Sequence, residues 1–178
     1  MDIVKICKQL GASDVVEVPV KKIVLQPEIR GLCEQNTCGR INTNYTCPPH
    51  VGKIEDLIAE LSSFSTVVIW QNIYSVEDSF DYDGMMEGQA KHHRMTLEVA
   101  RQVYNELGRK KAIVLTAGGC FLCKQCAVVS NTPCKNPNKA LISLEAYGVN
   151  VVETSMNIGM KYINGKDTVT YFSGVFIK

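Results

Sequence analysis

Apolar positions recur along the chain with two periods, one typical of helices and one of strands. Steps of three and four residues predict helices over residues 3–10, 53–64 and 85–107. Short runs rich in β-branched residues predict strands over residues 15–25 (on both sides of Pro19), 66–73, 112–116, 149–152 and 168–177. Because helices and strands alternate, we expect an α/β layered fold with a mixed, mainly parallel sheet and helices packed on it.

Local turn and cap residues add detail to this pattern. Asn136 as cap and Pro137 at the first helical position predict a helix that runs through Tyr147 and ends at Gly148. An Asn164-Gly165 turn precedes the last strand. Two stretches lack either period and are expected to be ordered loops, at about residues 29–52 and 117–137. No linker divides the chain, so residues 1–178 are expected to form a single metal-binding domain.

Composition and charge exclude several classes of function. The net charge of +1 and the single Trp argue against a nucleic-acid interface. No apolar run reaches the roughly 18–20 residues of a membrane span. The N-terminus carries Asp2, Lys5 and Lys8 where a signal peptide needs an apolar stretch, so we expect a cytoplasmic protein. In that reducing compartment, the eight cysteines are expected to be metal ligands or catalytic groups before disulfides.

The strongest motif has the spacing C-x2-C-x2-C-x7-C-x2-P and follows a Gly118-Gly119 pair. Its cysteines are Cys120, Cys123, Cys126 and Cys134. Bacterial ferredoxins use a closely related spacing to bind 4Fe–4S clusters. Structural zinc sites generally take two ligands from each of two separate knuckles, and a second C-x2-C unit is absent here. The spacing therefore favours an iron–sulfur cluster over zinc.

A second cysteine group lies in the earlier loop and contains Cys33, Cys38 and Cys47, followed by Pro48-Pro49-His50. Three thiolates leave one position open, as in catalytic metal sites, unless another residue closes it. His50 is the nearest nitrogen, and with it the group also matches a Cys3His zinc site. A cluster here could also borrow Cys134 from the first group. We expect both cysteine loops to meet at one end of the sheet.

The remaining candidates have ordinary structural interpretations beside functional ones. Cys7 lies on the apolar face of the first helix and is expected to be a core residue. His93 extends the apolar stripe of the long helix. It is expected to be either a hydrogen-bonded core residue or a proton donor or ligand beside a cluster. His92 is expected to face solvent. Three lysines flank the strong motif: Lys124, Lys135 and Lys139. They are either ordinary solvated lysines or cations that favour the reduced state of a cluster.

The CPPH segment, the GGC-x2-C-x2-C segment and the PC-x2-P segment with its following EAYGV resemble an uncharacterised prokaryotic family. Its members are labelled "predicted metal-binding protein", and the resemblance extends from Cys33 to about Val152. What it implies is a set of metal ligands: Cys33, Cys38, Cys47, Cys120, Cys123, Cys126 and Cys134. Cys7 lies outside that pattern. The resemblance also implies an anaerobic bacterium or archaeon as the setting, and it names no substrate.

Three functions follow from these residues. The first is an iron–sulfur protein with one or two 4Fe–4S clusters that exchanges electrons with a redox protein partner; neither a G-x-G-x-x-G nor a P-loop motif is present for a nucleotide. The second is an enzyme that uses the open iron of a three-cysteine cluster for sulfur removal or dehydration. The third is a structural zinc module. The sequence alone does not decide whether the protein is an enzyme.

Overall fold

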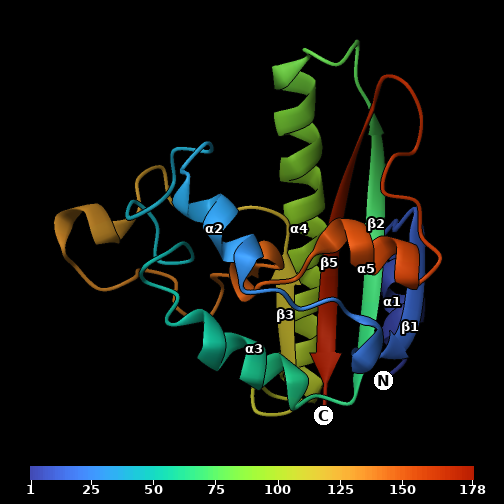
Figure 1. The fold of residues 1–178 in the computed structure, drawn as a ribbon, viewed down its shortest axis with the longest axis horizontal. Helices are drawn as coiled ribbons and strands as arrows, with labels where there is room; N and C mark the ends of the chain where they lie inside the picture. Colours follow the sequence, from blue (N-terminus) through green and yellow to red (C-terminus); the bar gives the residue numbers. More distant parts are fainter.

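The computed structural model describes residues 1–178 and places a five-stranded sheet between two layers of helices (Figure 1). The strands are β1 (Asp14–Pro19), β2 (Thr66–Ser75), β3 (Ala112–Thr116), β4 (Ile142–Ser143) and β5 (Thr168–Ile177). The α-helices are α1 (Ile3–Gln9), α2 (Glu28–Glu34), α3 (Ile54–Ser62), α4 (Tyr82–Glu106) and α5 (Val151–Asn157). Three short 3-10 turns are η1 (Val20–Lys22), η2 (Ala127–Ser130) and η3 (Glu145–Tyr147).

The strand order is β1-β2-β5-β3-β4, and only β3 and β4 pair in parallel. The sheet is therefore mixed, as expected, but the expectation of a mainly parallel sheet is wrong. β2 and β3 do run in the same direction around the crossover helix α4, as alternation of helix and strand predicts. The last strand, β5, inserts between them and pairs antiparallel with both.

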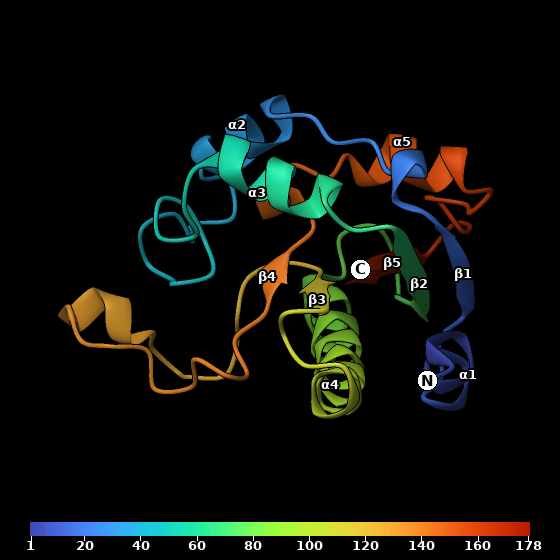
Figure 2. The ribbon, with the colours of Figure 1, turned by 90° about the horizontal axis from the view of Figure 1, so that it is seen from below.

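The interior strand β2 is buried on both faces, which explains its continuous apolar sequence. Val67 and Ile69 face a core formed with α3, η1 and η3, whereas Val68 and Trp70 face a core formed with α1 and α4. This alternation follows from the period of two in a strand. Figure 2 shows the result, with α1 and α4 on one face of the sheet and α2, α3 and α5 on the other.

The long helix α4 begins at a cap, where Asp81 accepts a hydrogen bond from the amide of Gly84 at 2.8 Å. It ends before Gly108, whose φ of +74° is the left-handed conformation that terminates helices. Its buried face is formed by Gly88, His92, His93, Met95, Thr96, Val99, Ala100 and Val103. Small and polar residues therefore make up much of the contact with the sheet, and the apolar positions alone do not define that face.

Four local predictions are wrong. The strand expected over residues 15–25 ends at Pro19, and Val20–Lys22 form η1. Residues 28–34 form α2 inside the region expected to be a loop, and residues 151–157 form α5 where a strand was expected. The helix expected from Asn136 to Gly148 is absent, since Ile142–Ser143 pairs with β3 and only Glu145–Tyr147 turns. This pairing with a neighbouring strand outweighs the helical spacing of the apolar residues. β3 keeps its predicted bounds, and so does β5.

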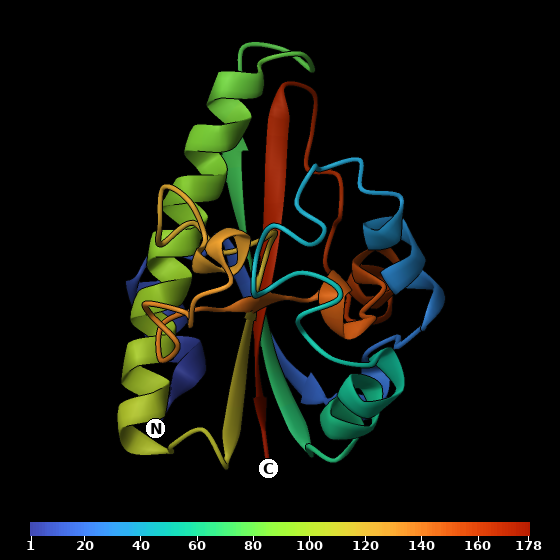
Figure 3. The same ribbon diagram turned by 90° about the vertical axis from the view of Figure 1, so that its left-hand side faces the viewer.

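Both cysteine-containing loops lie beyond the β4 edge of the sheet, and Figure 3 views the molecule from that side. The first loop follows α2, and the second connects β3 with β4. Because β3 and β4 are parallel, with Thr116 opposite Ser143, the residues that follow each strand emerge at the same place. None of the helices combines the length and the hydrophobicity that a membrane span requires.

Candidate metal centre

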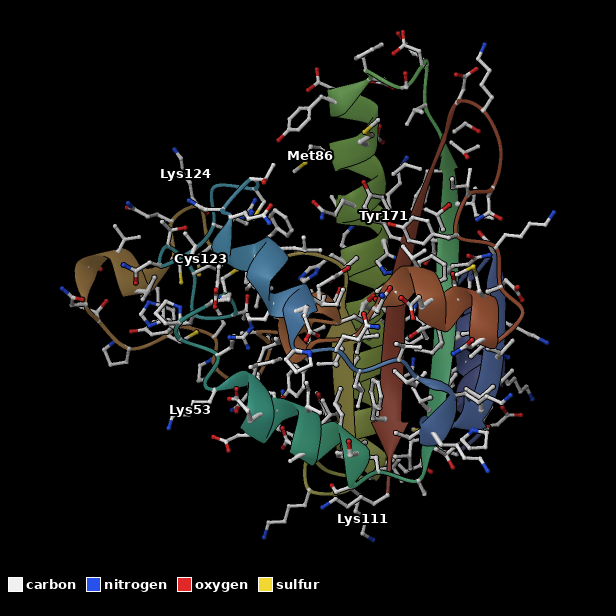
Figure 4. All side chains as sticks on the ribbon, viewed as in Figure 1. Lys53, Met86, Lys111, Cys123, Lys124 and Tyr171 are labelled. Carbon is white, nitrogen blue, oxygen red and sulfur yellow. The ribbon has the colours of Figure 1, made fainter.

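The four-cysteine group lines one cavity of about 370 Å³ beyond β3. Its thiols, from Cys120, Cys123, Cys126 and Cys134, are all half-buried and free of disulfide bonds. The chain reaches this cavity through Gly118, whose φ of +71° is a conformation that glycine adopts without strain. Figure 4 shows Cys123 beside Lys124 on this loop, well away from the sheet.

Polar groups surround the thiols of this cavity. The side-chain amide of Asn136 donates a hydrogen bond to Sγ of Cys123 at 3.4 Å. Burial raises the pKa of the Cys120 thiol, and the charges of the three other cysteines add to the effect. A metal that binds these cysteines would therefore displace protons from them.

The three-cysteine group lines a second cavity of about 550 Å³. Cys33 lies in the last turn of α2, whereas Cys38 and Cys47 come from the loop that follows. Burial, and after it the neighbouring thiols of Cys38 and Cys33, raise the pKa of Cys47 to about 11. Burial also raises the pKa of Cys33, and the nearby carboxylate of Glu145 is the next largest cause. Thus the structure gathers the three thiols with a carboxyl group.

The two cysteine loops are in direct contact, which confirms the expectation that they meet. The amide of Cys120 donates a hydrogen bond to Oγ1 of Thr46 at 3.0 Å, and the side-chain amide of Asn44 donates to the carbonyl of Cys120 at 2.9 Å. A Cβ added to Gly119 would lie 3.2 Å from Cδ of Arg40, a tight contact, and 3.4 Å from Sγ of Cys47. Glycine at this position therefore allows the second loop to approach the first.

A single cation, Arg40, lies between the two groups and lines both cavities. Its guanidinium carbon is 4.2 Å from the ring centroid of Phe121, which holds the side chain by a cation–π contact. Its charge acts to lower the pKa of Cys47, in opposition to burial. Negative charge in either cavity would be stabilised by the same residue.

The thiols line the walls of their cavities and do not converge on one point. No group of three or more His, Cys, Asp or Glu side chains is close enough to hold a single metal ion. Four cysteine ligands of zinc would each lie about 2.3 Å from the ion. Thiolates that bind a 4Fe–4S cluster sit at separated corners of a cube, so a cysteine-lined cavity suits this larger group.

Comparison with known families adds one finding. Residues 16–177 match the family model described as "Predicted metal-binding protein (DUF2284)". The chain belongs to this family. No curated protein and no solved structure matches it.

The histidines of this DUF2284 protein occupy three different environments. His50 is exposed, and its Nε2 lies 2.9 Å from Oδ1 of Asn42 outside the three-cysteine cavity, so the structure does not place it with the thiols. His93 is buried, as expected, with its ring edge-on to Phe121, but neither of its nitrogens has a hydrogen-bond partner. The expectation that His92 faces solvent is wrong, because this residue is 0% exposed.

Cys7 of the DUF2284 protein is a core residue, as expected. It is 0% exposed and packs with Ile3, Val15 and residues of α4 on the far side of the sheet. Burial raises the pKa of its thiol to about 12. The three lysines near the four-cysteine cavity, Lys124, Lys135 and Lys139, are exposed.

Sequence reasoning missed Arg40, Asn44, Thr46, Gln89 and Glu145, which line the cavities or link the loops. Of these, Glu145 had a signal that the sequence could have provided. It follows β4 at the edge where the residues after β3 also emerge, so recognising the short strand would have placed its side chain near the cysteines. The contacts of Asn44 and Thr46 depend on long-range docking of two loops, which has no local signature.

Proposed function

We propose that this DUF2284 protein is an iron–sulfur protein that exchanges electrons with a redox partner protein through two neighbouring clusters. One 4Fe–4S cluster would be held by Cys120, Cys123, Cys126 and Cys134, and a second by Cys33, Cys38 and Cys47. The single observation that carries the proposal is the pair of adjoining cavities, each lined by one cysteine group and both lined by Arg40.

Iron is preferred to zinc for two reasons. Three cysteines within seven residues match ferredoxin spacing, and the side chains do not form a group of three or more ligands around one point, as a single zinc ion would need. The amide of Asn136 also donates to Sγ of Cys123, and such hydrogen bonds tune the potentials of iron–sulfur clusters. Because Cys38 is exposed, we propose the cytoplasm of an anaerobe as the setting, where thiols and clusters survive.

Electron transfer is supported by the contact between the loops and by the distribution of charge. Four thiolates would complete the coordination of the first cluster and leave no position there for a substrate. The segment from Leu107 to Leu144, which contains this group, has six Lys and Arg and neither Asp nor Glu. The rest of the chain holds 13 of the 19 basic residues and all 18 acidic ones. A partner with an acidic surface would therefore be attracted to this end of the molecule.

A second candidate function, an enzyme, is favoured by the contents of the larger cavity. Its walls carry the polar side chains of Arg40, Gln89 and Glu145 beside the three thiols, and its volume of about 550 Å³ is that of a small-molecule site. Met86 of α4 also lines it and points toward the loops in Figure 4. An iron with an open position there would act as a Lewis acid for sulfur removal or dehydration.

Anaerobic purification followed by assays for iron, zinc and inorganic sulfide tests the proposal. We expect about eight irons and about eight sulfides per chain, with a brown colour from thiolate-to-iron absorption. Cys123→Ala is expected to lose about half of both, and so is Cys47→Ala, whereas Cys7→Ala keeps the full content. Stoichiometric zinc without sulfide would instead support the structural zinc module.

Electron paramagnetic resonance (EPR) spectra separate the two iron-based functions. An electron-transfer protein is expected to show reduced-cluster signals that candidate substrates leave unchanged. A signal that shifts on addition of a small substrate would identify an open iron and favour the enzyme.

A further inference from the structure

The three-cysteine group lacks the fourth protein ligand that the other group has, and the structure places a carboxyl group in its cavity. Among the residues that line this cavity, Glu145 is the only acidic one. It is the first residue of η3 and follows β4 after one intervening residue. Gly118 and Gly119 of the second loop line the same cavity.

The carboxyl group of Glu145 forms no salt bridge, although Arg40 lines the same cavity. None of the ion pairs in the structure includes this residue. Arg30 of α2 is buried, and its guanidinium donates two hydrogen bonds to the carbonyl of Ala146, at 2.7 and 3.1 Å. It donates a third to the carbonyl of Gly52, at 3.2 Å. Arg40 lies over the ring of Phe121. The half-buried carboxyl group has hydrogen-bond partners in the hydroxyl of Ser143 and in its own backbone amide but no salt-bridge partner, and a bound cation would balance its charge.

We propose that Glu145 is the fourth protein ligand of the three-cysteine site, with a carboxylate oxygen bound to the iron that Cys33, Cys38 and Cys47 leave open. This inference rests on the proposed iron–sulfur function. The oxygen would take the place of a water molecule, which leaves to solvent. His50, the ligand suggested by sequence proximity, lies outside the cavity and contacts Asn42 instead.

The test compares the wild type with Glu145→Gln, Glu145→Cys and a matched control, Glu34→Gln. Glu34 neighbours Cys33 in the sequence but is exposed and does not line the cavity. Each protein is purified anaerobically and assayed for iron, sulfide and EPR signals. We expect Glu145→Gln to fall from about eight to about seven irons at unchanged sulfide, with a new three-iron signal. Glu145→Cys should restore the lost iron, and Glu34→Gln should match the wild type.

Full iron content and an unchanged spectrum in Glu145→Gln would overturn the inference and leave the two clusters in place. Wild-type protein without iron and sulfide would overturn the proposed function as well, so the two failures are distinguishable. Mössbauer spectroscopy of the wild type gives an answer that does not depend on the folding of a variant. One iron with oxygen coordination is expected, and a set of irons bound only by sulfur would reject Glu145 as a ligand.

Discussion

Oγ1 of Thr46 accepts a hydrogen bond from the amide of Cys120 and donates one to Oδ1 of Asn44, both at 3.0 Å. Asn44 in turn donates to the carbonyl of Cys120. Both side chains are buried, so water does not replace these bonds. The two cysteine loops are therefore joined by a closed set of hydrogen bonds at the first residue of the four-cysteine motif.

We predict that Thr46→Val weakens this junction at constant side-chain size. The part-buried amide of Cys120 would lose its partner, which costs about 1 kcal/mol. Denaturant unfolding is expected to show this loss, and the absorbance of the clusters should decay faster in air. Thr43→Val is the control, because Thr43 is exposed and bonds only to Arg40 within its own loop. Equal effects of the two substitutions would contradict the prediction.

Arg40 is predicted to tune both clusters, since it lines both cavities. Arg40→Met removes the cation and keeps a long side chain against Phe121. Each added electron would then lose a favourable interaction, so both reduction potentials should become more negative by on the order of tens of millivolts. An EPR-monitored redox titration measures the shifts. Lys22→Met, near the opposite edge of the sheet, should leave both potentials unchanged.

The members of each cysteine group line one cavity because they are close in sequence. Three thiols within seven residues can only lie near one another, and Cys120, Cys123 and Cys126 do. The bounds of β3 and β5 were also clear from their apolar runs. The insertion of β5 between β2 and β3 was not clear from the sequence, because strand order depends on long-range pairing that no local period encodes.

The burial of polar residues in the core was also not predicted from the sequence. His92 reads as a solvent-facing residue, yet its ring nitrogens lie 2.7 Å from Oδ1 of Asn72 and 2.6 Å from Oγ of Ser173. Those partners lie on β2 and β5, so the network exists only after the sheet forms and α4 packs on it. The chain Ser173–His92–Asn72 resembles a catalytic triad, but Ser173 is 0% exposed and no substrate can reach it.

The partner surface is predicted to depend on the lysines around the four-cysteine cavity. Replacing Lys124, Lys135 and Lys139 together by Glu reverses the charge of this exposed rim. Electron transfer to an acidic ferredoxin, followed by stopped-flow absorbance, should slow by roughly 10–100-fold at low salt and recover toward wild type at high salt.

Two controls accompany the charge reversal. Lys5→Glu with Lys8→Glu on α1, at the opposite edge of the sheet, should leave the rate with the acidic ferredoxin unchanged. Basic cytochrome c should react faster with the triple variant than with the wild type, because the sign of the interaction is reversed. A rate with acidic ferredoxin that is independent of both charge and salt would reject this surface.

His92 is predicted to make stability depend on pH. Burial lowers its pKa from 6.5 to about 3, so the unfolded chain binds a proton that the folded protein does not. Stability is then fully present above pH 6.5 and is lost as pH falls toward 3, by roughly 2 kcal/mol between pH 7 and pH 5. Urea unfolding at several pH values measures this slope, with iron content checked at each pH.

His92→Gln should be less stable at pH 7, because the polar network is disturbed, but its loss of stability between pH 7 and pH 5 should be smaller by roughly 2 kcal/mol. Burial also lowers the pKa of His93, so some slope should remain in this variant. An unchanged slope in His92→Gln would show that His92 takes up its proton in the folded protein over the same pH range as in the unfolded chain.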